Sequence, residues 1–214
     1  MPARRRARSA GLTIRVGTVR DVPTILALIR GLAEYERLLR ECHATPAQLR
    51  RHGFGRRPYF HTLICRRDGR AVGFALYFFT YSTFLSRPTL YLEDLFVVPE
   101  ERGRGAGRAL LGALGRIAVR KGCGRLEWAV LDWNTPAIRF YKKLGAGFRK
   151  EWILTRLTGP PLRRLAHQVR APGLRPPAPA SRLRVSRVGG ETLRAIRGRT
   201  GASRPSSRAS PAGR

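Results

Sequence analysis

Two adjacent acids, Glu93 and Asp94, stand inside an apolar run, YLEDLFVV, that covers residues 91–98. Acids in such a place can attract a cation or accept its proton. A proline follows the run, and residues 102–108 then form a turn rich in glycine and arginine, RGRGAGR. Glycine lets a ligand approach the backbone closely, and the unpartnered N–H groups at a helix start favour an anion. The stretch therefore predicts a phosphate-binding loop directly after a pair of acids.

The loop matches neither of two common phosphate motifs. A P-loop needs a lysine followed by serine or threonine after its second glycine, and the dinucleotide fingerprint needs a glycine where Arg108 stands. A glycine-rich turn from a strand into a helix, with no ligand, is the alternative interpretation of the same residues.

Alternating strand and helix patterns surround the loop. Strands are predicted over residues 12–16, 59–66, 71–81, 90–98, 125–131 and 151–157, with an Asp68-Gly69 hairpin turn after the second of them. Helices are predicted over residues 22–33 with Asp21 as N-cap, after the Thr45 and Gln48 capping box, and over residues 104–121 and 134–144. This order predicts one α/β domain with a mixed sheet over residues 12–158.

The charge of the chain is strongly unbalanced, with 43 Lys+Arg against 13 Asp+Glu and a formal net charge of +30. This balance suits a polyanionic partner, but a bias of the source genome toward arginine explains it equally well. Residues 1–11 form a basic leader and residues 159–214 an Arg/Pro-rich tail. We expect both to be mostly disordered, because neither can bury a core. Nucleic-acid binding by the tail is an unsupported alternative to an extension without function.

The remaining reactive residue types show no metal or disulfide pattern. Cys42, Cys65 and Cys123 lack the spacing of ligands or of a disulfide framework, and His52 and His61 are isolated. No apolar run is long enough to span a bilayer, and Arg15 interrupts any signal-peptide core. We therefore expect a soluble, cytoplasmic protein that holds no metal.

Several blocks, in the same order, resemble the GCN5-related N-acetyltransferase (GNAT) superfamily. Within it they are most similar to the diamine acetyltransferases, which include the spermidine/spermine and thialysine enzymes. The blocks are Arg102-x-x-Gly105-x-Gly107, LAEYE at 32–36, HGFGRRPYFH at 52–61, ALYFFTYSTF at 75–84, LYLEDLFV at 90–97 and WNTPAIRFYKKLGA at 133–146. The resemblance covers residues 12–157 and implies the GNAT fold, a central mixed sheet flanked by helices.

The resemblance also implies a reaction, the direct attack of a neutral amine on the thioester of acetyl-CoA. Glu93 would assist the amine, through a water or by electrostatic attraction, with Asp94 as its neighbour and alternative. Adjacent strand residues face opposite sides of a sheet, so we expect that both acids cannot serve one pocket equally. A backbone N–H of residues 96–98 would stabilise the oxyanion. Tyr141 would protonate the departing thiolate, and a core aromatic role is the alternative for it.

The same resemblance implies two sets of binding residues. The coenzyme set comprises Leu95, Phe96, Val97, Val98, Arg102, Gly103, Arg104, Gly105, Ala106, Gly107, Arg108, Asn134, Pro136, Ala137, Tyr141 and Lys143. The amine set comprises Tyr35, Glu36, Glu93, Asp94, Glu127, Trp128, Ala129 and Glu151. Acids are scarce in this chain, so their concentration in the second set argues for an amine-bearing substrate. The cationic exterior favours a smaller amine, a diamine or lysine analogue, over a long polyamine.

Relatives of this kind form homodimers, and we expect the same here. A peptide or protein amine or an aminoglycoside are alternative acceptors with the same chemistry. A hypothesis from a different class is a basic nucleic-acid-binding protein whose GNAT fold is incidental. Its binding would weaken steeply with salt and would survive mutation of Tyr141.

Overall fold

A computed structural model describes residues 11–168 of the chain. They divide into two compact units, of which the first ends at Phe148 and the second begins at Arg149. The predictions of disorder for residues 1–10 and 169–214 lie outside the described residues.

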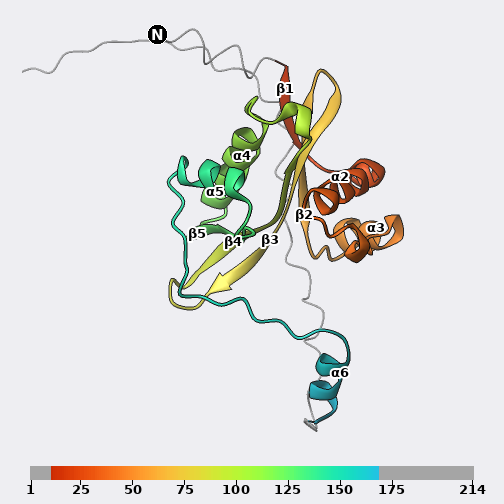
Figure 1. Ribbon diagram of the computed structural model, residues 1–214, viewed down its shortest axis with the longest axis vertical. Coiled ribbons are helices and arrows are strands. Elements are labelled where there is room, and N and C mark those ends of the chain that lie inside the picture. The colour runs from red at the N-terminus through yellow and green to blue at the C-terminus, as the bar shows by residue number, and fades with distance from the viewer. Residues whose placement is uncertain (1–10, 169–214) are drawn as a thin grey trace, which may run out of the picture. The chain divides into compact units, whose positions relative to one another are not determined.

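A mixed sheet forms the centre of the first unit (Figure 1). Its strands, in both chain and spatial order, are β1 (Leu12–Val16), β2 (His61–Arg67), β3 (Arg70–Ser82), β4 (Arg87–Val97) and β5 (Arg125–Trp128). Neighbouring strands are antiparallel except for β4 and β5, which are parallel. Asp68 and Gly69 both have positive φ, 49° and 80°, which confirms the predicted tight turn between β2 and β3.

Helices cover both faces of this sheet. Figure 1 shows α2 (Val22–Tyr35) and α3 (Pro46–Phe54) on one face, and α4 (Ala106–Arg120) and α5 (Thr135–Lys142) on the other. Ile25 of α2 packs with Ile64 of β2, and Leu110 and Leu114 of α4 pack with Leu90 of β4. Thr45 and Gln48 form the predicted capping box at the start of α3. Short 3₁₀ helices lie at Val19–Asp21 (η2), Leu39–Glu41 (η3) and Pro99–Glu101 (η4).

The parallel pair of strands separates partway along β4. Its register runs from Thr89 opposite Arg125 to Leu92 opposite Trp128, where β5 ends three residues short of the predicted 125–131. Strand β4 continues to Val97. Among the described residues, 93–97 therefore have no strand partner on the β5 side. Apart from the Val97 carbonyl, which accepts from Arg102, backbone groups on that side are available to a ligand.

A β-bulge lies at the same point of β4. Leu92 pairs with Tyr77 and Asp94 pairs with Leu76, so Glu93 between them has no partner in β3. Leu92 packs in the core that α4 covers, and Leu95 packs against the same core three residues later. The strict alternation expected for Glu93 and Asp94 therefore does not hold, because the bulge inserts one residue and shifts the pattern.

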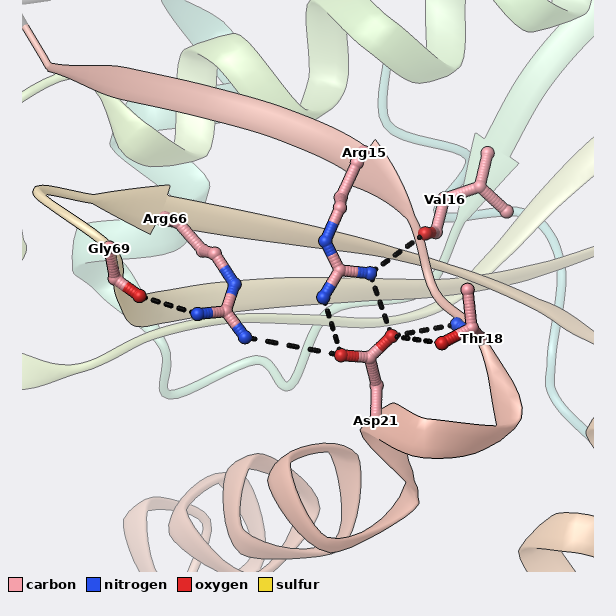
Figure 2. Close-up of polar contacts among 6 residues, drawn as sticks. All are labelled: Arg15, Val16, Thr18, Asp21, Arg66 and Gly69. Atoms are coloured by element: carbon pink, nitrogen blue, oxygen red, sulfur yellow. Dashed lines mark hydrogen bonds and ion pairs between the residues drawn. The ribbon is translucent and has the colours of Figure 1, made fainter.

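Asp21 stands at the N-cap position of α2, as predicted, but its side chain makes no capping hydrogen bond. Asp21 precedes the helix, but its buried carboxylate accepts hydrogen bonds from elsewhere: from Arg15 at 2.7 and 2.5 Å and from the backbone N–H and hydroxyl of Thr18, each at 2.8 Å (Figure 2). Arg66 lies 4.0 Å away and is held by the Gly69 carbonyl. Asp21 thus joins β1 and β2 to the start of α2.

The second unit departs from the sequence prediction in two ways. Residues 151–157 are not a strand, although their composition favours one, because no neighbouring strand supplies hydrogen-bond partners among the described residues. Gly159–Gln168 form a helix, α6, so the disorder predicted for residues 159–214 does not extend to this part. Pro160 and Pro161 stand in its first turn, where proline is tolerated.

Candidate active site

The glycine-rich loop connects η4 to α4 and takes a conformation that glycine favours. Gly103 and Gly105 have φ of 73° and 96°, in the left-handed region, and Gly105 is the N-cap of α4. The N–H groups of Ala106, Gly107 and Arg108 stand in the first helical turn, where no intrahelical acceptor is available. The helix dipole adds a partial positive charge there. The backbone of this loop can therefore bind an anion.

Two arginine side chains of the loop are held by the protein itself. Arg102 donates through Nε to the Val97 carbonyl at 3.1 Å, and its guanidinium carbon lies 4.3 Å from the centroid of the Tyr35 ring. Arg104 donates to Glu101 at 2.7 Å. Arg108 is exposed in the first turn of α4. The backbone N–H groups of the loop are thus available to bind an anion. The side chains of Arg102 and Arg104 would have to leave their present hydrogen-bond partners to reach a phosphate.

Three acids interact where β4 separates from β5. The pKa of Asp94 is raised to about 7, chiefly because the carboxyl is removed from water and further because Glu93 and Glu36 lie near it. Burial also raises the pKa of Glu36, which follows the end of α2. The sequence predicted that these acids share a site, and the structure brings them together.

Tyr91 belongs to the same group of residues, although the sequence did not single it out. It is opposite Glu127 in the parallel ladder, and burial raises its pKa, with smaller contributions from Glu93 and Glu127. Glu127 also forms an ion pair of 3.1 Å with Arg125. The charges of Glu127 and Glu93 therefore both act on the Tyr91 hydroxyl. Only the register of β4 against β5 reveals this, and composition carries no signal of that register.

Tyr141 lies on α5 at the boundary between the core and these acids. Its side chain is buried against Trp128 and Phe140, with ring centroids 5.0 and 5.4 Å away. Burial raises its pKa to about 12, and the charge of Glu36 adds to the effect. The charge of Glu36 raises the pKa of both Asp94 and Tyr141, so Glu36 lies within electrostatic range of both groups.

A hydrogen bond between α2 and α5 passes the open edge of β4. The Tyr35 hydroxyl donates to Asn134 Oδ1 at 3.1 Å, and the same oxygen accepts the Ala137 N–H at 3.3 Å. Asn134 is thus the N-cap of α5, as predicted. Because α2 and α5 cover opposite faces of the sheet, this contact lies where β4 has no neighbour on the β5 side.

The remaining predicted site residues lie on other parts of the described chain. Pro136 and Ala137 are in the first turn of α5, whereas Lys143 is exposed at its opposite end. Ala129 is exposed just beyond β5. Glu151 belongs to the second unit, where it pairs with Arg149 at 3.3 Å. A groove of about 520 Å³ runs beside Tyr35 and Arg102, with Glu34 and Glu100 among its lining residues.

Comparison with known proteins identifies the family. The Acetyltransferase (GNAT) family matches residues 28–146. The chain belongs to the GNAT acetyltransferases. This family uses acetyl-CoA, and the fold described above, a mixed sheet flanked by helices, is the family's fold.

Curated relatives of this GNAT acetyltransferase act on amines. Thialysine N-epsilon-acetyltransferase of Mus musculus is 38% identical over 168 residues, which are 73% of this chain and 98% of the relative. L-ornithine N5-acetyltransferase of Arabidopsis thaliana is 47% identical over 43% of this chain and 40% of its own. A Homo sapiens spermidine/spermine N(1)-acetyltransferase-like protein is 37% identical over 62% of this chain and 20% of its own. The chain is therefore an N-acetyltransferase.

Solved structures with the same fold include an integron cassette protein of V. cholerae. Its TM-score is 0.63 at 25% identity, over 73% of this chain and 98% of the other.

No helix among residues 11–168 has the length and apolar character needed to cross a membrane.

Proposed function

We propose that the chain transfers the acetyl group of acetyl-CoA to a primary amine of a small molecule, a diamine, polyamine or lysine analogue. The observation that carries this proposal is the position of Glu93 and Asp94 at the open edge of β4, with the charge of Glu36 acting on both Asp94 and Tyr141. Carboxylates collected at one site in a chain of net charge +30 suit a cationic substrate.

Asp94 is suited to receive the proton of the amine. An ordinary carboxylate is a poor base for an alkylammonium ion, whose pKa is about 10.4. Raising the pKa of Asp94 from 3.8 to about 7 reduces the free-energy gap for that proton transfer by about 4 kcal/mol. Glu93, the exposed residue of the bulge, would attract the cation and could relay the proton through a water. This division of labour gives Glu93 its predicted role in assisting the amine and makes Asp94 the base.

The thioester would lie along the unpaired part of β4. The backbone N–H of Val97, on the open side of β4, would bind its carbonyl oxygen, because the Val98 N–H already donates to the Val72 carbonyl at 3.0 Å. The first-turn N–H groups of α4 would bind the pyrophosphate. Tyr141 keeps its proton at neutral pH because burial raises its pKa to about 12. Its hydroxyl is therefore present as a donor to the departing sulfur. In this arrangement the amine is attracted, deprotonated and acylated within one opening of the sheet.

The acceptor is proposed to be a small amine because two relatives named thialysine N-epsilon-acetyltransferase each match 73% of this chain. The cationic surface favours a diamine or lysine analogue over a long polyamine.

We also propose a homodimer. Trp152, Ile153 and Leu154 are 75%, 86% and 76% exposed, and a second copy could cover them.

The test is a thiol-release assay with acetyl-CoA across lysine analogues, diamines, polyamines, aminoglycosides and short peptides. Small diamines or lysine analogues should give the highest kcat/KM. Asp94→Asn should reduce kcat/KM by about 10²-fold or more and abolish the rise in rate near pH 7, as expected for a lost general base. Glu93→Gln should mainly raise the KM for the amine. A preference for peptides, or full activity of Asp94→Asn, would contradict the proposal.

A further inference from the structure

A buried ion pair lies directly under the glycine-rich loop. Arg67 is the last residue of β2 and Glu101 the last of η4, and each is 9% exposed. Arg67 Nε donates to Glu101 Oε2 at 2.7 Å. Charged residues are seldom this deeply buried without a partner, and the site proposed above does not use the pair.

The pair is fastened to both sides of the loop. Glu101 stands before it, and its second oxygen, Oε1, accepts from Arg104 Nη1 at 2.7 Å. Arg67 Nη2 donates to the backbone carbonyl of Arg104 at 3.0 Å. One guanidinium on a strand of the sheet therefore fixes the residue before the loop and a peptide group inside it.

The contact with the Arg104 carbonyl determines the direction of a backbone donor. The carbonyl of Arg104 and the N–H of Gly105 belong to the same planar trans peptide, so they point in opposite directions. Since the carbonyl points at buried Arg67, the Gly105 N–H points the other way, outward from the core. Gly103 and Gly105 leave this segment conformationally free, and no side chain of either glycine restrains it.

We propose that Arg67 is a positioning residue for coenzyme binding, which acts through Glu101 and the Arg104 carbonyl to hold the loop in its anion-binding conformation. The inference rests on the proposed function, because it requires that the loop binds the pyrophosphate of acetyl-CoA. Arg67 is buried and bonds the loop from the protein side. Its effect is to orient N–H donors before the coenzyme arrives.

The proposal predicts different effects on two acetyl donors, acetyl-CoA and acetyl-pantetheine. Acetyl-pantetheine has the thioester but no pyrophosphate. Arg67→Lys retains the charge, but an ammonium group lacks the planar guanidinium that lets one side chain bond both Glu101 and the Arg104 carbonyl. We expect it to lower kcat/KM for acetyl-CoA about tenfold, the equivalent of one charge-assisted hydrogen bond. The kcat/KM for acetyl-pantetheine should stay within about twofold, and kcat at saturating acetyl-CoA should be nearly unchanged.

Two further variants separate positioning from folding. Arg67→Met with Glu101→Leu replaces the buried pair by apolar side chains, which folds are known to tolerate. A thermal melt checks that it is folded, and it should show the same selective loss for acetyl-CoA. Arg70→Met is the matched control, because Arg70 forms an exposed ion pair of 2.7 Å with Glu100 one strand away. Arg70→Met should leave kcat/KM unchanged for both acetyl-CoA and acetyl-pantetheine.

The outcomes are distinguishable. An equal loss for both donors, or no loss in the folded double variant, would overturn the positioning role while leaving the proposed function intact. A wild-type protein that acetylates no amine with either donor and does not bind coenzyme A in calorimetry would overturn the proposed function, and this inference with it.

Discussion

At the scale of single residues, the site depends on one inserted residue in β4. The bulge at Glu93 shifts the side-chain alternation, so that Asp94 interacts with Glu36 beyond the end of α2 while Glu93 remains exposed. Two neighbouring acids thereby acquire different environments. One is half-buried with a pKa of about 7, and the other is placed to meet a cation from solvent. Such a difference suits a division between base and attractor.

Tyr141→Phe tests the proposed donor to the thiolate. Removing the hydroxyl should lower kcat by about 10²-fold or more, which is typical for the loss of a general acid. Coenzyme A binding, measured by calorimetry, should change less than about twofold, because the ring still packs on Trp128 and Phe140. An unchanged kcat would show that another group protonates the sulfur.

Asp94→Asn should stabilise the protein at alkaline pH. The folded pKa of Asp94 is raised from 3.8 to about 7, so the folded state binds more protons than the unfolded state between these values. Stability is therefore lost as pH rises through this window, and the full cost is present above it. We expect the variant to gain about 1–2 kcal/mol in urea unfolding at about pH 8, after allowance for partial exposure, and almost nothing at about pH 4. An equal change in the free energy of unfolding at both pH values would mean that ionisation of Asp94 does not destabilise the folded protein.

The sequence selected candidate site residues but did not describe their environments. Glu93, Asp94, Asn134 and Tyr141 were selected by residue type and neighbouring motif, and their roles in catalysis and binding stay predictions. Which acid is buried depends on the bulge, and a bulge follows from pairing with β3 across the hairpin. Such pairing is a tertiary property, and local composition does not encode it.

At the scale of elements, the network around Asp21 joins β1, β2 and the start of α2 (Figure 2). Hydrogen bonds from Arg15, and then from Thr18, hold the pKa of Asp21 well below its usual range despite burial. Asp21 occupies the predicted N-cap position, but its side chain makes no capping hydrogen bond because these donors occupy the carboxylate. Helix α2 carries Tyr35, so the network also helps to fix one wall of the site.

Asp21→Asn should destabilise the protein in a pH-dependent way. A depressed folded pKa contributes stability above the unfolded value of about 3.9, and this stability is lost as pH falls below it. We expect a loss of about 2–3 kcal/mol at about pH 7 in urea unfolding, because a nearly buried carboxylate loses its charge-assisted bonds. The difference between the variant and the wild type should shrink toward about pH 3. Glu41→Gln, in η3, is a control that should show little effect at either pH.

Elements with local signals were predicted well, and elements that need a distant partner were not. The Asp68-Gly69 turn and the Thr45 capping box are encoded within a few residues, and both are confirmed. Residues 151–157 have strand composition but no strand partner among the described residues, and β5 ends at Trp128 for want of continued pairing. Strand composition is a preference that becomes a strand only when a neighbour satisfies its backbone.

At the scale of the whole molecule, the site is formed where the two faces of the sheet meet. Helix α2 contributes Tyr35 from one face, α5 contributes Asn134 and Tyr141 from the other, and the open edge of β4 lies between them. Three of the 13 acids, Glu36, Glu93 and Asp94, interact at this opening, while Lys and Arg outnumber Asp and Glu by 43 to 13 in the whole chain. In the proposed function, the same protein would attract an amine locally and repel a polycation at longer range.

Removal of the basic ends should change the preference among amines. A chain of residues 11–170 lacks fourteen arginines and Glu191, which lowers the formal net charge from +30 to +17. At low ionic strength its kcat/KM for spermine should rise about three- to tenfold because long-range repulsion of a polycation weakens. The value for a lysine analogue should change less than about twofold, since its net charge is small.

Salt provides the internal control for this comparison. Repulsion is screened over about 8 Å at physiological ionic strength, so added salt should raise spermine turnover by the full chain and erase its difference from the shortened chain. Thiol release at several salt concentrations measures both effects. If the shortened chain instead loses activity toward spermine at low salt, the ends assist the acceptor, and the preference for smaller amines does not arise from the charge of the molecule.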